Sequence, residues 1–84
     1  MTTDQPPPRH VRGETTLYGY LLGLGPGTAI VELNSWRKLT IQIPEGMAAK
    51  LRDRVGTDVG ISGVATWQTD YWAMVAFEAV ELTS

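Results

Sequence analysis

The side chains best suited to binding chemistry are three aromatic residues close to one predicted turn. Trp67, Tyr71 and Trp72 fall within six positions around a reversal at 68–70. Tyr and Trp are common anchors of protein interfaces, and their rings also stack on nucleic-acid bases. Because alternation along a strand cannot bury all three rings on one side, we expect at least one to be exposed. The competing interpretation is that Trp67 and Trp72 pair across two strands and merely close the end of a sheet.

A cationic pair, Arg37 and Lys38, is the second candidate group. Both residues follow a predicted turn at 34–35, where they are available to a phosphate or a carboxylate of a partner. Glu32 lies near them across the expected hairpin, and such an exposed ion pair would contribute about 0 to 1 kcal/mol. The predicted partner-binding residues are therefore Trp67, Tyr71, Trp72, Arg37 and Lys38.

Catalytic and metal-binding chemistry has little support in the sequence. The chain has no cysteine, and its single histidine, His10, stands near prolines without a visible partner. The acidic residues are scattered and show neither a paired-carboxylate frame nor a metal-ligand spacing. The glycine-bearing turn at 25–27 is not followed by the Lys-Ser/Thr and helix of a phosphate-binding loop. We therefore expect a non-enzymatic protein that needs no cofactor and no metal.

Length and composition predict one small domain. The 84 residues are 43% hydrophobic and 19% charged, as in ordinary globular proteins, and the formal net charge is −2. This acidic balance disfavours nonspecific nucleic-acid binding, which depends on clustered Lys and Arg. The absence of cysteine suits a reducing cytosol, and no apolar run approaches a signal peptide or a membrane span. We therefore expect a cytoplasmic protein that does not bind membranes.

The chain is expected to divide into a leader at 1–12 and a folded domain at 13–84. The leader contains three consecutive prolines, which donate no backbone hydrogen bonds and hold the chain extended. It is therefore predicted to be disordered, with a docking peptide or a basic arm as the alternative.

The remaining pattern predicts a mainly β domain with one helix. Apolar and polar residues alternate at 28–33 and 38–43, which predicts two half-buried strands. Aromatic and aliphatic composition predicts further strands at 15–24, 59–67 and 71–82. A helix is expected at 45–55, because proline and glutamate suit its first turn and apolar residues recur at helical spacing. Glycines in the fourth strand allow the bending that a closed sheet requires. The expected core consists of Leu17, Leu21, Val31, Leu33, Leu39, Ile41, Met47, Leu51, Val59, Ile61, Val75 and Phe77.

Two further expectations concern the last strand and the remaining tryptophan. A bulge near Ala79 would bring Val80 and Leu82 onto the side of Phe77 and leave both glutamates of this strand in water. Trp36, beside the 34–35 turn, is expected to cap one end of the barrel rather than to stand exposed as an anchor.

The order strand, strand, strand, helix, strand, strand resembles the OB-fold over residues 15–82. The segment VGTDVGISGVATW at 55–67 also looks like small bacterial OB-like proteins, some of which are associated with toxin-antitoxin or defence loci. The resemblance implies a five-stranded antiparallel OB-like barrel. It further implies a protein-interaction or regulatory module whose partner is another protein or a second copy of the chain. The alternative is a single-stranded nucleic-acid-binding OB domain.

Overall fold

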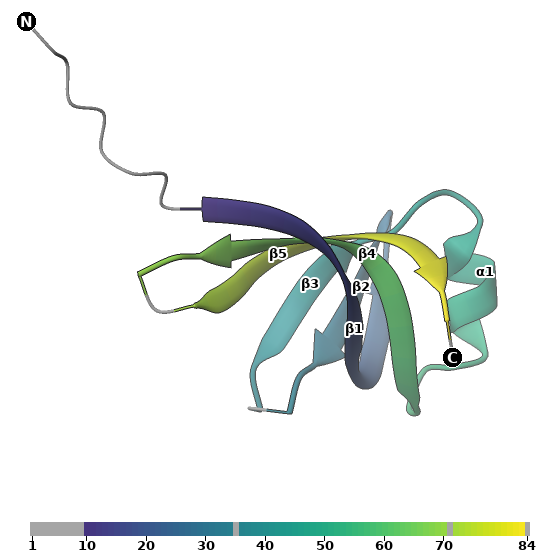
Figure 1. The fold of residues 1–84 in the computed structure, drawn as a ribbon. Helices are drawn as coiled ribbons and strands as arrows, with labels where there is room; N and C mark the ends of the chain where they lie inside the picture. Colours follow the sequence, from purple (N-terminus) through teal and green to yellow (C-terminus); the bar gives the residue numbers. More distant parts are fainter. Residues whose placement is uncertain (1–9, 35, 71, 84) are drawn as a thin grey trace, which may run out of the picture.

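The fold is a closed barrel of five strands with one short helix (Figure 1). The computed structural model describes residues 10–34, 36–70 and 72–83. The predicted class and element order are confirmed. The elements are β1 (His10–Gly25), β2 (Thr28–Glu32), β3 (Lys38–Gln42), α1 (Met47–Arg52), β4 (Asp58–Gln68) and β5 (Ala73–Leu82).

The strands follow one another around the barrel in the order β1-β2-β3-β5-β4. Four of the pairs described are antiparallel, whereas β3 and β5 are parallel, with Gln42 opposite Glu78. The barrel is thus mixed and not antiparallel throughout as predicted. The reason is geometric, because an odd number of strands cannot alternate in direction all the way around a ring.

Strand β1 pairs with β4 along its first part and with β2 along its last part, and it is longer than predicted. Residues 10–20 pair with β4, and residues 20–25 pair with β2, so the strand bends sharply near Tyr20. At the bend, a Cβ on Gly19 would contact the Val31 side chain and lie 2.7 Å from the Glu32 carbonyl oxygen. Strand β1 already begins at His10, within the expected leader, and residues 1–9 of that leader lie outside the described residues.

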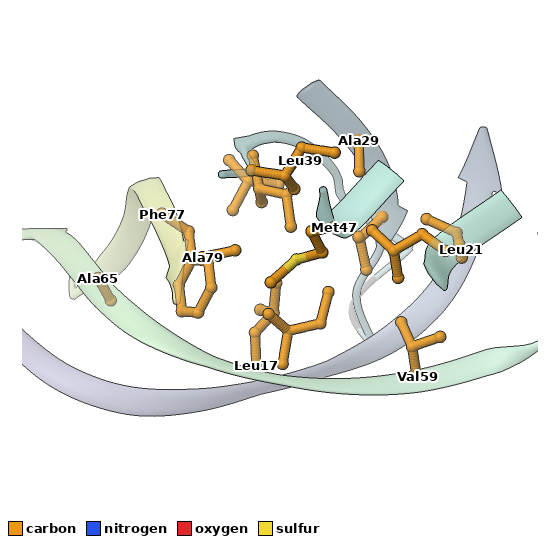
Figure 2. Close-up of a cluster of buried hydrophobic side chains, with 14 of the residues drawn as sticks. Leu17, Leu21, Ala29, Leu39, Met47, Val59, Ala65, Phe77 and Ala79 are labelled. Carbon is orange, nitrogen blue, oxygen red and sulfur yellow. The ribbon is translucent and has the colours of Figure 1, made fainter. Parts of the chain in front are cut away.

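The core fills the space between the strands and α1 (Figure 2). All of the predicted core residues are buried except Leu33 and Val75, which are half-buried. The helix is shorter than expected, because Gly46 precedes it with φ 92° and turns occupy residues 53–56. Its six residues still bury Met47 and Leu51, which anchor it to the barrel. None of the described helices is long and apolar enough to cross a membrane.

Strand β5 contains two bulges that decide which of its side chains face inward. The pairing with β4 skips Val80, close to the predicted bulge at Ala79. Leu82 returns to the core side as expected and both glutamates are exposed, but Val80 is 65% exposed, contrary to the prediction. The pairing also skips Val75, which turns both Met74 and Phe77 inward. Each extra residue reverses the alternation locally.

Candidate binding groove

Two hairpin turns border a groove on the barrel surface. The β2–β3 turn contributes Leu33, Asn34 and Arg37, and the β4–β5 hairpin contributes residues on both sides of its turn. In Figure 1, both turns lie away from α1. The groove, called here the turn groove, has a volume of about 470 Å³ and is open to solvent. It is lined by Leu17, Tyr18, Leu33, Asn34, Arg37, Trp67, Trp72, Ala73 and Met74.

Short hydrogen bonds shape both turns. The Leu33 amide donates to the Arg37 carbonyl oxygen at 2.8 Å, and the Trp36 amide donates to the Leu33 carbonyl oxygen at 3.0 Å. In the β4–β5 turn, the Gln68 side-chain amide donates to a carboxylate oxygen of Asp70 at 3.2 Å. The two backbone bonds hold the β2–β3 turn, whereas the contact at the β4–β5 turn joins two exposed side chains.

An aromatic pair forms one wall of the turn groove. The ring centroids of Trp67 and Trp72 lie 6.4 Å apart with an interplanar angle of 64°, an edge-to-face contact. Trp67 packs partly against the core, whereas Trp72 is 64% exposed. The cross-strand pair therefore forms, and one ring is exposed as expected. The pair presents a supported aromatic surface to solvent.

The other predicted binding residues are placed differently. Arg37 lines the turn groove and is the one charged residue among its described lining residues. Lys38 begins β3, where it lies opposite Glu32 in the β2–β3 register. Tyr71 lies outside the described residues. The structure thus brings Arg37, Trp67 and Trp72 together, although they belong to different hairpins.

Sequence reasoning missed several apolar residues of this groove. Leu33 was predicted to be core, but it is half-buried and also lines the groove. Met74 joins the lining because the bulge at Val75 turns it inward, and Tyr18 joins because β1 passes beside the β2–β3 turn. No sequence pattern revealed that residues next to the β2–β3 turn and residues of the β4–β5 hairpin line the same groove.

Two tryptophans have left-handed backbone conformations. Trp36 has φ 65° and Trp72 has φ 47°, in a backbone region that residues other than glycine rarely adopt. Trp36 is 84% exposed, so the prediction that it caps the barrel is wrong. In this turn conformation its indole is directed into solvent. Strained exposed aromatics of this kind occur at binding sites.

Replacing Trp36 with glycine is expected to leave the free energy of unfolding nearly unchanged. The indole contributes little burial, and glycine adopts positive φ without the roughly 1 kcal/mol cost borne by other residues. Because glycine also gives the unfolded chain more conformational freedom, which offsets this gain, we expect Trp36→Gly to change the free energy of unfolding by less than about 1 kcal/mol in urea denaturation. A decrease of more than about 1 kcal/mol would show that the indole packs on the barrel in solution.

The described residues contain no group of three or more histidine or carboxylate side chains able to hold a metal ion. Comparison of the chain with protein-family models, curated proteins and solved structures finds no significant match. The turn groove is therefore the feature of this protein that bears on its function.

Proposed function

We propose that this protein is a non-enzymatic protein-interaction or regulatory module that binds an extended segment of a partner protein in the turn groove. The proposal is carried by one observation: the exposed ring of Trp72 contacts Trp67 edge to face in a mainly apolar groove that Arg37 also lines. Trp and Arg are the residue types that dominate binding energy at protein interfaces. A supported ring also loses little side-chain freedom when a partner covers it.

The lining defines the chemistry of the expected partner segment. Leu33, Met74 and the two tryptophans offer an apolar surface suited to one large aliphatic or aromatic side chain. Arg37, as the charged member of the described lining, favours a carboxylate next to that side chain, because guanidinium and carboxylate pair in a bidentate geometry. The partner segment should therefore carry a bulky apolar residue flanked by Asp or Glu.

The scaffold is consistent with this role. A closed barrel holds both hairpin turns on paired strands, and binding residues are commonly found on loops that a rigid scaffold positions. The element order supports an OB-like barrel, a fold that binds ligands with its loops and one outer face. A cytoplasmic regulatory role of the kind served by small bacterial OB-like proteins forms part of the same proposal.

Selection from a random peptide library against the full chain tests the proposal. We expect enriched peptides to combine an aromatic or large aliphatic residue with neighbouring carboxylates. The Arg37→Glu variant should lose the preference for acidic peptides, since the charge that selects them is reversed. Lys38→Glu is the matched control, because Lys38 is the adjacent cation but lies opposite Glu32, and it should select the same peptides as the natural chain. Enrichment unaffected by Arg37→Glu, or no enrichment, would contradict the proposed site.

Single-stranded nucleic-acid binding is the second candidate, because Trp72 could stack on a base while Arg37 contacts a phosphate. It is disfavoured by the formal net charge of −2 and by the single cation in the described lining. We expect fluorescence anisotropy with mixed single-stranded DNA or RNA at physiological salt to show weak or undetectable binding. Submicromolar affinity that falls steeply with added salt would place nucleic-acid binding first.

A further inference from the structure

The first part of β1 has a neighbouring strand on one side only. Residues 10–16 pair with residues 62–68 of β4 without a register shift, whereas β2 pairs with β1 only from Tyr20 onward. Among the described residues, no strand pairs with the other side of residues 10–16. In Figure 1 this part of β1 extends away from α1 along the outer side of β4. Such an edge exposes backbone donors and acceptors that can pair with another strand.

The hydrogen bonds of Leu21 show which backbone groups along β1 face the open side of this edge. The Leu21 amide donates to the Thr57 carbonyl oxygen at 2.9 Å, and the Leu21 carbonyl oxygen accepts from the Gly56 amide at 2.8 Å. The backbone groups of Leu21 therefore point toward the β4 side. Because successive residues alternate in an antiparallel strand, the backbone groups that point to the open side belong to His10, Arg12, Glu14 and Thr16.

The charges on this edge are self-complementary. If a second copy of the strand approaches antiparallel with Gly13 opposite Gly13, then Arg12 of each copy faces Glu14 of the other. Arg12 and Glu14 are exposed and share one face of the sheet, so both cross-strand pairs would form on that face. In this register, Arg12 and Glu14 are also the residues whose backbone groups point outward, so they form hydrogen-bonded pairs. On the other face, Val11, which is 42% exposed, would lie opposite Thr15 of the second copy.

We propose that the edge formed by residues 10–16 is a homodimer interface, in which the β1 strands of two copies pair antiparallel about a two-fold axis at Gly13. The partner is a second copy because one symmetric register satisfies both the backbone groups and the alternating charges. This interface is separate from the turn groove and does not depend on the proposed function. Seven residues on each side form a small contact, so the dimer should be populated at micromolar or higher concentrations.

One intramolecular contact competes with this arrangement. Arg12 donates to a carboxylate oxygen of Glu78 at 3.3 Å, and both side chains are about 60% exposed. Exposed ion pairs contribute about 0 to 1 kcal/mol, so this contact does not hold Arg12 against a second partner. Glu78→Gln removes the competing carboxylate and leaves the edge intact, which makes it a suitable control.

Charge reversal on the full chain tests the register. Sedimentation equilibrium between about 20 and 500 µM should show dimers of the natural chain, in keeping with a small interface. Arg12→Glu or Glu14→Arg alone should raise the dimer dissociation constant about tenfold or more, because each creates two like-charge pairs. An equimolar mixture of the two variants should regain the natural affinity within about threefold as a heterodimer, since the mixed pairs are complementary. Glu78→Gln should stay within about threefold of the natural chain.

A cysteine at the axis gives an independent readout, because the chain contains no cysteine of its own. A Cβ on Gly13 meets no atom within 4 Å, so Gly13→Cys fits the fold. Across the axis, the two residues would form a non-hydrogen-bonded pair with Cα atoms about 4.5 Å apart, which permits a disulfide. In Thr15→Cys the corresponding Cα atoms would be about 13 Å apart, too far for one.

We expect Gly13→Cys to form a covalent dimer at least tenfold faster than Thr15→Cys under the same mild oxidation. The addition of Glu14→Arg to Gly13→Cys should slow this reaction. Circular dichroism confirms that each variant is folded. A natural chain that stays monomeric up to about 500 µM would overturn the inference. Equal oxidation rates for the two cysteine variants, or single charge variants that dimerise as well as the natural chain, would also overturn it.

Discussion

Gly63→Ala is expected to be among the most destabilising single substitutions in this chain, lowering the free energy of unfolding by about 3 kcal/mol. A Cβ at this position would overlap the Glu78 carbonyl oxygen and lie 2.9 Å from two ring carbons of Phe77. Phe77 is almost fully buried, so any movement of its ring has to displace its neighbours in the core. The close approach of β4 and β5 at the bulge therefore requires glycine, and the extra methyl group must displace the backbone.

Gly23→Ala provides the matched control for this prediction. A Cβ on Gly23 meets no atom within 4 Å, so its alanine variant should have unchanged stability or gain up to about 1 kcal/mol. Urea denaturation followed by circular dichroism measures both variants, provided that the dependence on urea concentration stays the same. Equal stability of the two variants would mean that the β4–β5 approach is looser than described.

Trp72→Ala is expected to raise the dissociation constant of a groove-binding peptide about 30-fold, corresponding to about 2 kcal/mol for an interface anchor. The expected loss of folding stability is only about 1 kcal/mol, because the ring is mostly exposed and its main contact is the edge-to-face pair with Trp67. The prediction therefore separates binding from folding. Isothermal titration with a peptide selected on the natural chain measures the first quantity, and urea denaturation measures the second.

Trp36→Ala is the matched control for Trp72→Ala. Trp36 is an equally large exposed ring on the adjoining turn, and it is not among the residues that line the groove. Its removal should change peptide affinity less than about threefold. Equal losses for the two variants would point to a general aromatic surface rather than the turn groove. A loss of stability well above 1 kcal/mol for Trp72→Ala would assign this ring to the core.

The regular parts of the barrel could be predicted because their side-chain pattern reports directly on burial. Val31, Leu39 and Ile41 alternate with residues that face outward in short strands, and all three are buried. Met47 and Leu51 lie one helical turn apart and bury the same face of α1. In these elements the spacing of apolar residues in the sequence matches the spacing of buried residues in the structure.

The irregular parts could not be predicted because several strands determine them together. The bulge that turns Met74 inward depends on the pairing of β5 with β4, and β1 extends to His10 because β4 continues beside it. The turn groove depends on the closure of the barrel, which brings Arg37 and Trp72 to the same groove. Trp36 was misplaced because a large aromatic residue is usually buried, whereas here the turn conformation exposes it. The aromatic residues of the groove could be predicted from the sequence, but its aliphatic lining residues could not.

Chemical-shift mapping of the ¹⁵N-labelled chain during titration with a selected peptide tests the turn groove most directly. The chain contains three tryptophans, whose indole N–H groups give separate signals. We predict large shifts for the indoles of Trp67 and Trp72 and for the amides of Leu33 and Arg37, with little change at Val80 on another part of the surface. Shifts centred on Val80, or on the outer face of β2 and β3, with the Trp67 and Trp72 signals unmoved, would contradict the proposed binding site.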